Sequence, residues 1–196
     1  DRQPRHIECF DNSNLQGAHP VASCVVFRDG KPARKEYRHF NIKTVEGPDD
    51  YASMREVVFR RYSRLQEEGA ELPDLIIADG GKGQMGIIHE VLEYLGLDIP
   101  VAGLAKNDRH RTSELLCGYP PVLVGIRPTS PLFHFLAHIQ EEVHRFAVSF
   151  HRQKRSKAFI HSELEQIEGI GDKTIRTLLQ HFRSVAKVKA APAEEL

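Results

Sequence analysis

The sequence predicts an α/β domain, built as one mixed sheet flanked by helices, with a small all-α appendage at the C-terminal end. Three observations support this fold class. Three strand-like segments joined by turn residues open the chain and indicate an antiparallel β-meander. Buried-strand patterns then alternate with amphipathic helical patterns, as in α/β units. Beyond a basic tract, the pattern changes to two helices around a Gly-rich turn.

Size and composition exclude several protein classes. The chain has 196 residues, 40% of them hydrophobic, and a formal net charge of zero, which suits one ordinary domain plus a small one and excludes a mainly disordered chain. No apolar run approaches the ~18–20 residues of a membrane span. The chain opens on Asp1 rather than Met, so we expect a fragment of a longer protein. Its 3 cysteines form no C-x-x-C pair, which predicts a reduced, cytoplasmic protein.

The meander occupies the first 42 residues. Residues 6–10 are extended into Asp11, and a turn-rich loop follows. A continuous β-branched run at 21–27 predicts a buried strand. The Asp-Gly and Pro of 28–32 are typical of a hairpin, after which 33–42 predicts the third strand.

The α/β units follow. A helix is predicted from Asp49 to residue 68, with acidic residues in its first turn and Gly69 after its last. A strand at 74–79, a helix at 84–96 and a strand at 100–105 come next. Alternation at these lengths indicates parallel pairing with right-handed crossovers.

The remainder contains a short hairpin over 115–125 and a helix from Pro131 to Phe150. Residues 162–182 then read as helix, tight turn and helix, a unit too small for a core of its own unless it pairs with another element. We therefore expect two domains, 1–155 and 156–196.

Asp11 and Asp79 are the first candidate site residues because each ends a predicted strand. In α/β sheets, ligands gather at the carboxyl ends of strands, and a carboxylate there can hold a metal ion. Gly80 and Gly81 follow Asp79 and would let a phosphate approach the backbone, beside the N-terminus of the next helix. In the alternative interpretation, Asp79 caps the turn and the glycines only satisfy its geometry.

Two strand-end aspartates suggest metal-dependent phosphodiester cleavage, with a third group supplied by the 131–150 helix. That helix offers both Glu141 and His144, and periodicity leaves the choice between them open. His134 and His138 have the i, i+4 spacing of a zinc pair but lack a third ligand nearby, which disfavours zinc.

Further candidates lie at helix starts and in the basic tract. Helix capping explains at least one of Asp49 and Asp50. The turn at 167–171 has glycines before a helix N-terminus with Lys173 close behind, which favours an anion site for one DNA phosphate over an ordinary helix–helix turn. The 144–157 tract carries five basic residues and no acid, either a solvated face or a phosphate contact.

Five segments together carry a family resemblance: FDNSNLQG, VASCVVF, GPDDYASM, DGGKGQ and HRFAVSFHRQKR, in this order. They resemble the C-terminal half of UvrC, a family of nuclease subunits of bacterial nucleotide excision repair. The resemblance implies an RNase H-like (endonuclease V-like) domain that makes the 5′ incision beside a lesion, followed by a tandem helix-hairpin-helix DNA-binding domain.

The resemblance also implies residue roles. Asp11, Asp79 and His144 match the family's catalytic Asp-Asp-His set, and Asp50 matches a further aspartate implicated in incision. Asp11 and Asp79 would hold Mg²⁺ or Mn²⁺, with His144 as a further ligand or a proton donor or acceptor, since imidazole exchanges protons near neutral pH. The expected DNA contacts are Arg145, Arg152, Lys154, Arg155, Gly169, Gly171 and Lys173.

The implied partners are damaged double-stranded DNA, UvrB and, indirectly, UvrA; we expect a monomeric fragment. Only one hairpin is present, and the family's GIY-YIG nuclease and its UvrB-contacting segment are absent from this sequence. Two rival functions are a catalytically silent RNase H-like DNA-binding platform and a deoxyinosine-directed nuclease. Salt-sensitive DNA binding without metal dependence would indicate the platform.

Overall fold

The computed structural model describes residues 3–13, 21–45, 47, 49–106, 112–165, 167 and 169–195. For residues 151–163 it describes the backbone alone. The chain divides into two units, Asp1–Val148 and Ser149–Leu196.

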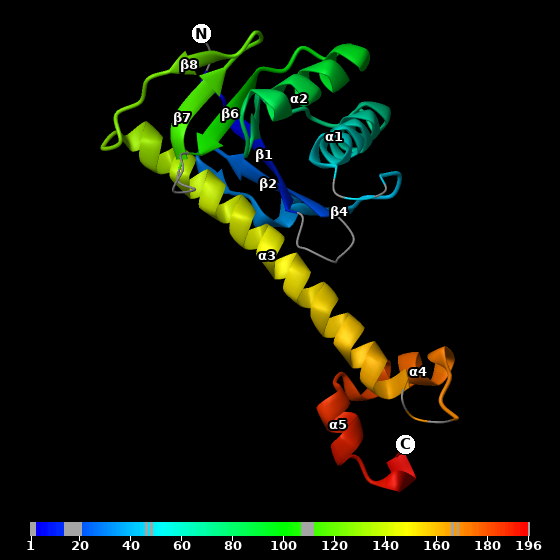
Figure 1. Ribbon diagram of the computed structural model, residues 1–196. Helices are drawn as coiled ribbons and strands as arrows, with labels where there is room; N and C mark the ends of the chain where they lie inside the picture. The colour runs from blue at the N-terminus through cyan, green and yellow to red at the C-terminus, as the bar shows by residue number, and fades with distance from the viewer. Residues whose placement is uncertain are drawn as a thin grey trace. The chain divides into compact units, whose positions relative to one another are not determined.

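An antiparallel meander forms one side of the sheet in the first unit (Figure 1). Strand β1 (His6–Ser13) pairs along its whole length with β2 (Val21–Arg28), and β2 pairs with β4 (Arg38–Asn41), as the sequence predicts. The two-residue strand β3 (Lys31–Pro32) pairs with the other end of β2.

The predicted third strand over 33–42 is wrong in its first half. Only Arg38–Asn41 is extended, and a 3₁₀ helix, η1 (Arg34–Glu36), precedes it. Pro32 has no N–H with which to continue the β3 ladder. The turn instead brings Glu36 to Arg28, whose Nη2 lies 3.0 Å from Glu36 Oε1.

Parallel strands form the middle of the sheet. Strand β5 (Leu75–Ala78) is parallel to both β1 and β6 (Val101–Lys106), which confirms the expected α/β pairing. Strands β7 (Thr112–Cys117) and β8 (Val122–Val124) extend the sheet as the predicted antiparallel hairpin. The strand order is β3-β2-β1-β5-β6-β7-β8, with β4 also beside β2.

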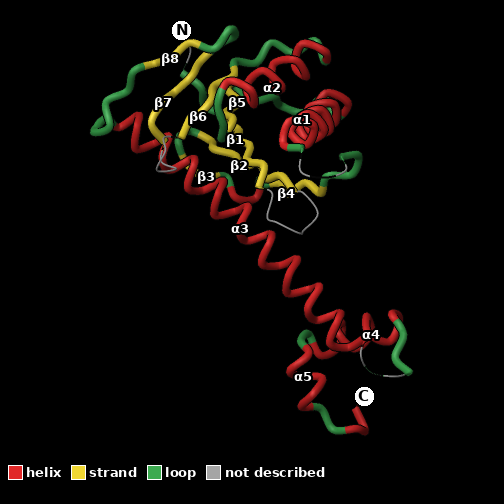
Figure 2. Tube along the Cα trace, viewed as in Figure 1, coloured by secondary structure: helices red, strands yellow, loops and turns green. Residues whose placement is uncertain are grey.

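Helices cover both faces of this sheet (Figures 1 and 2). Helices α1 (Asp50–Glu67) and α2 (Lys82–Tyr94) lie on one face, where Phe10 of β1 meets Tyr62 of α1 edge to face at 6.1 Å. The first part of α3 (Pro131–Glu165) covers the other face, where Phe27 of β2 meets Phe135 at 5.8 Å. Because strand residues alternate between faces, even-numbered β1 residues face α1 and odd-numbered ones face α3.

The predicted end of α3 at Phe150 is wrong, because the helix continues to Glu165. No Gly or Pro follows Pro131 within it, so nothing in the backbone stops the helix before the turn that contains Gly169. Within the described ranges, no helix is both long enough and apolar enough to cross a membrane.

The second unit has a small apolar core, because the 162–182 segment packs against the helix that follows it. Helices α4 (Asp172–Phe182) and α5 (Val185–Ala190) follow the end of α3, and a 3₁₀ helix, η2 (Ala193–Glu195), comes last. This core consists of Leu164, Ile175, Leu178, Val185 and Val188. The helix–turn–helix pattern predicted over 162–182 is therefore confirmed as secondary structure.

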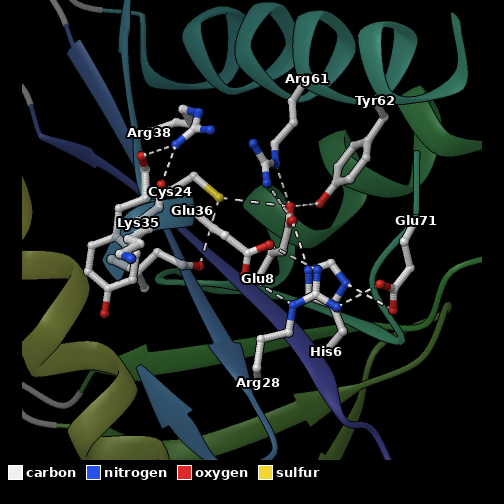
Figure 3. Close-up of polar contacts among 12 residues, drawn as sticks. His6, Glu8, Cys24, Arg28, Lys35, Glu36, Arg38, Arg61, Tyr62 and Glu71 are labelled. Atoms are coloured by element: carbon white, nitrogen blue, oxygen red, sulfur yellow. Dashed lines mark hydrogen bonds and ion pairs between the residues drawn. The ribbon is translucent and has the colours of Figure 1, made fainter. Parts of the chain in front are cut away.

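A buried ionic network lies on the α1 face of β1 (Figure 3). Glu8 is 0% exposed, and its two carboxylate oxygens accept 2.5 Å hydrogen bonds from Arg61 Nη2 and Nε. Tyr62 Oη donates to the same carboxylate at 2.8 Å, and His6 Nε2 lies 3.2 Å from it. Burial raises the pKa of Glu8, but these hydrogen bonds and the Arg61 charge outweigh it and hold the pKa at about 2.

Candidate active site at the ends of β1 and β5

The two predicted aspartates lie side by side at one end of the sheet. The β1–β5 ladder ends at the pair Phe10 and Ala78, and Asp11 and Asp79 come directly after it. The Asp79 N–H donates to the Phe10 carbonyl at 2.9 Å, which continues the ladder by one bond. Both side chains therefore emerge on the α3 face. Asp11 is 7% exposed, although β1 runs two residues beyond it rather than ending there.

Helix α3 brings one side chain to each aspartate. His144 Nδ1 lies 3.9 Å from Asp11 Oδ2, and the imidazole is 65% exposed. One turn earlier, Gln140 Nε2 donates to Asp79 Oδ1 at 2.5 Å. Of the two α3 candidates, His144 lies near Asp11, whereas Glu141 is exposed elsewhere on the helix.

The neighbouring acid, Glu142, is buried in contacts that hold α3 in place rather than lying at the site. It is buried, and its carboxylate accepts hydrogen bonds from Arg145 Nη2 at 2.7 Å and Tyr37 Oη at 3.0 Å. The Arg145 hydrogen bond, with smaller contributions from Tyr37 and Arg34, lowers the pKa of Glu142. Glu142 thus ties α3 to the segment before β4 and also engages Arg145, one of the predicted DNA contacts.

Asp50 is linked to β1 through its backbone carbonyl. Asp49 is the N-cap of α1, with its Oδ1 accepting from Ala52 N at 2.9 Å, which confirms that capping explains one of the two. The Asp50 carbonyl accepts from Asn12 Nδ2 at 2.8 Å, and the Asp50 side chain is exposed. The start of α1 is therefore fastened to the residue after Asp11.

The oxygen-rich donors at this edge suit a hard divalent cation. Ser23 Oγ, on the α3 face with the two aspartates, is buried and forms no hydrogen bond with any residue the structure describes, whereas Asn12 Oδ1, which is also buried without such a bond, lies on the opposite, α1 face. Ser23 is the direct cross-strand neighbour of Asp11. Among the described residues, no three His, Cys, Asp or Glu side chains converge to hold an ion by themselves, so His144 does not join the two aspartates in a ready-made set. A cation held by Asp11 and Asp79 would take its further donors from amide, hydroxyl, water or substrate oxygens.

The zinc pair considered from the sequence has another role. The His138 ring packs edge to face on Phe27 at 5.5 Å, within the α3–sheet contact. In the glycine loop after Asp79, a Cβ on Gly80 would lie 2.6 Å from Gln84 Cγ, whereas a Cβ on Gly81 would meet nothing within 4 Å.

The predicted DNA contacts are divided between the units. The side chains of Arg152, Lys154 and Arg155 lie outside the described part of the structure. In the second unit, Gly169 has φ +87°, a conformation that favours glycine, and Gly171 is the N-cap of α4. Lys173 is exposed in the first turn of that helix.

Gln140 and Ser23 were missed from the sequence. The available signal for Gln140 was its position one turn before His144 on the same face of the helix. For Ser23 it was a single hydroxyl within a continuous apolar strand.

Known proteins resemble this chain at several levels. A family model described as the UvrC RNAse H endonuclease domain matches residues 1–148. The UvrABC system protein C of Bacteroides fragilis is 60% identical over all of this chain, which spans 32% of that protein's length. The Streptococcus uberis protein of the same name is 56% identical over 99% of the chain and 33% of its own length. Among solved structures, Ciona intestinalis endonuclease V in complex with inosine-containing DNA aligns with 54% of this chain and 47% of its own at 16% identity, with a TM-score of 0.40.

Proposed function

The chain belongs to the UvrC RNase H endonuclease domain family, and from this premise we propose that it makes the 5′ incision at damaged DNA in bacterial nucleotide excision repair. The observation that carries the proposal is the pairing of Asp11 and Asp79 on adjacent parallel strands, with His144 facing Asp11. This arrangement supports hydrolysis of a phosphodiester bond at this end of the sheet.

Asp11 and Asp79 are the residues that would hold Mg²⁺ or Mn²⁺. The bound ion would supply an activated water and offset the negative charge on the leaving oxygen. His144, with its largely exposed ring, is placed to accept or donate a proton at the open side of the site. Asp50 would contribute as a helper from the start of α1, which the Asn12 side chain fastens to β1.

The DNA contacts would come from α3 and the second unit. Arg145, Arg152, Lys154 and Arg155 would follow the phosphate backbone, as cationic side chains do without reading sequence. The residues 156–196 would act as a helix-hairpin-helix domain, in which the N–H groups after Gly169 and Gly171 and the Lys173 ammonium meet one phosphate.

The relatives are named UvrABC system protein C, so we place the chain with UvrA and UvrB as partners and damaged double-stranded DNA as substrate. A cytoplasmic location fits the three free cysteines, Cys9, Cys24 and Cys117.

A nicking assay tests this function. Asp11→Asn and Asp79→Asn keep the shape of each side chain while removing its charge. Loss of an outer-shell partner of a metal already costs about 10–100-fold, so each change should slow Mn²⁺-dependent nicking of lesion-containing duplex by about 100-fold or more. DNA affinity should survive in both variants.

The matched control is Asp98→Asn, an exposed aspartate between α2 and β6. It should nick like the wild type. Nicking that persists in both strand-end variants would refute the assignment, and salt-sensitive DNA binding without metal-dependent nicking in any protein would establish the silent platform instead.

A further inference from the structure

Gln140 is a polar residue on the core-facing side of α3. At 100° per residue it shares this side with Leu136, Val143 and Ala147, all of which are buried. A polar side chain in such a place costs free energy unless it is hydrogen-bonded. Its amide meets this requirement at Asp79, where Nε2 donates to Oδ1 at 2.5 Å.

The contact fixes one carboxylate oxygen of Asp79. The backbone of Asp79 is already set by β1, through its N–H bond to the Phe10 carbonyl at 2.9 Å. What remains variable is rotation of the side chain, and the Gln140 amide restrains that rotation. Hydrogen bonds to a charged acceptor are about twice as strong as those between neutral groups, so this restraint is a firm one.

The donor is also chemically suited to a cation site. An amide carries no net charge, so it orients the carboxylate while leaving the full negative charge available to a cation. Gln140 donates a hydrogen bond to Asp79, and one turn later on the same helix His144 faces Asp11. The packing of α3 therefore brings a side chain to each strand-end carboxylate, but only Gln140 lies within hydrogen-bonding distance of its carboxylate.

We propose that Gln140 is a positioning residue that holds the Asp79 carboxylate in the orientation needed to bind a divalent ion. The inference rests on the proposed function, in that Asp79 is taken to hold the ion. Gln140 itself contacts neither metal nor DNA in this account and acts only through Asp79.

Calorimetric titration of Mn²⁺ into the full chain tests this role without any need for catalysis. Gln140→Met keeps the length of the side chain but removes the donor, and Gln140→Asn keeps the amide but is too short to reach. Each should weaken the Mn²⁺ Kd by about 10–100-fold, the usual effect of losing an outer-shell partner. The Mn²⁺ concentration for half-maximal nicking should rise by the same factor, with the rate recovering at saturating Mn²⁺.

Gln66→Met is the matched control. Gln66 donates from Nε2 to the Leu95 carbonyl at 3.0 Å, away from the two aspartates, and its loss should leave the Mn²⁺ Kd unchanged. The thermal unfolding midpoints without metal should be similar for all folded variants, because the expected effect is on ion binding rather than on folding.

Two results overturn the proposal. One is a wild-type Mn²⁺ Kd in a folded Gln140→Met or Gln140→Asn variant. The other is failure of both variants to fold, which would make Gln140 a structural residue of α3. Failure of the proposed function looks different: the wild type itself would show no Mn²⁺ binding that Asp79→Asn abolishes.

Discussion

Glu8 and Asp11 are three residues apart on β1, and their side chains lie on opposite faces of the sheet. Glu8 faces α1, where Arg61 and Tyr62 neutralise and satisfy it inside the protein. Asp11 faces α3, where His144 Nδ1 lies 3.9 Å from Asp11 Oδ2. Removing the Glu8 charge would leave Arg61 unpaired in a mostly buried position, whereas the Asp11 carboxylate lies at the end of the β1–β5 ladder, where we propose that a cation binds.

Removing the Glu8 charge should destabilise the first unit. Glu8→Gln would leave Arg61 without its counter-ion in a mostly buried position, and breaking a buried pair in this way costs roughly 3–5 kcal/mol. Chemical denaturation would show this loss in the free energy of unfolding. The exposed pair Arg64–Glu68 provides the comparison, since Glu68→Gln should leave the unfolding midpoint unchanged. Equal midpoints for Glu8→Gln and the wild type would contradict this interpretation of the network.

The same network predicts an acid limb of stability. The folded pKa of Glu8 is about 2, below its ordinary value of 4.5. The stabilisation, on the order of 3 kcal/mol at about 1.4 kcal/mol per pKa unit, is therefore present above about pH 4.5 and is lost as the pH falls toward 2. Urea midpoints measured across this window should fall more steeply for the wild type than for Glu8→Gln; parallel curves would show that Glu8 does not carry the effect.

At the scale of elements, the close approach of β6 to the glycine loop is the feature most open to test. A Cβ at Gly103 would lie 2.6 Å from Met85 Sδ and 2.8 Å from the Gly80 carbonyl oxygen, which is backbone and cannot move freely. Gly103→Ala should therefore cost about 1–3 kcal/mol of stability, the usual range for overpacking. Because Gly80 follows Asp79, Gly103→Ala should also weaken Mn²⁺ binding. Thermal unfolding and calorimetry would measure the two effects.

Gly86→Ala is the opposite case within α2. No atom lies within 4 Å of a Cβ built at Gly86, and alanine favours a helix interior by about 0.5–1 kcal/mol over glycine. This variant should be more stable than the wild type and bind Mn²⁺ normally. A stabilised Gly103→Ala variant would contradict the close packing of β6 against the loop.

Elements also show how far the sequence could predict the structure. The meeting of Asp11 and Asp79 followed from the rule that parallel strands share an edge, and it required no side-chain detail. The Gln140–Asp79 bond joins residues 61 positions apart and depends on how α3 is rotated on the sheet, which periodicity fixes only roughly. The predicted end of α3 at Phe150 lies inside the basic 144–157 tract, whose residues favour helix and include no Gly or Pro, so the helix runs through it.

The sequence also could not predict which polar residues pair over long distances along the chain. Glu8 lies in a strand of buried residues and is bonded to Arg61, 53 residues away, and neither local pattern points to the other. The turn at Arg34–Glu36 depends in the same way on the ion pair between Glu36 and Arg28.

At the scale of the whole molecule, the two units have separate cores. The larger extends over the sheet, α1, α2 and the start of α3, and the smaller is made of five residues from Leu164 to Val188. A surface change in one unit should therefore leave the chemistry of the other intact.

Lys173→Glu tests this separation. Reversing the charge in the first turn of α4 should weaken duplex binding, measured by fluorescence anisotropy at fixed salt, because it removes one phosphate contact and adds repulsion. The Mn²⁺ Kd should be unchanged. Lys31→Glu, an exposed lysine on β3, is the control and should have little effect on DNA binding. A normal DNA affinity for Lys173→Glu would argue against the hairpin as a phosphate contact.

The most direct test of the central claim is calorimetric titration of Mn²⁺ into the wild type, Asp11→Asn, Asp79→Asn and Asp98→Asn. It needs neither DNA nor partner proteins, so the state of a larger repair complex cannot affect the answer. We predict binding in the wild type and in Asp98→Asn, and its loss in both strand-end variants. Identical isotherms in all four proteins, or no binding in any, would contradict a metal site held by Asp11 and Asp79.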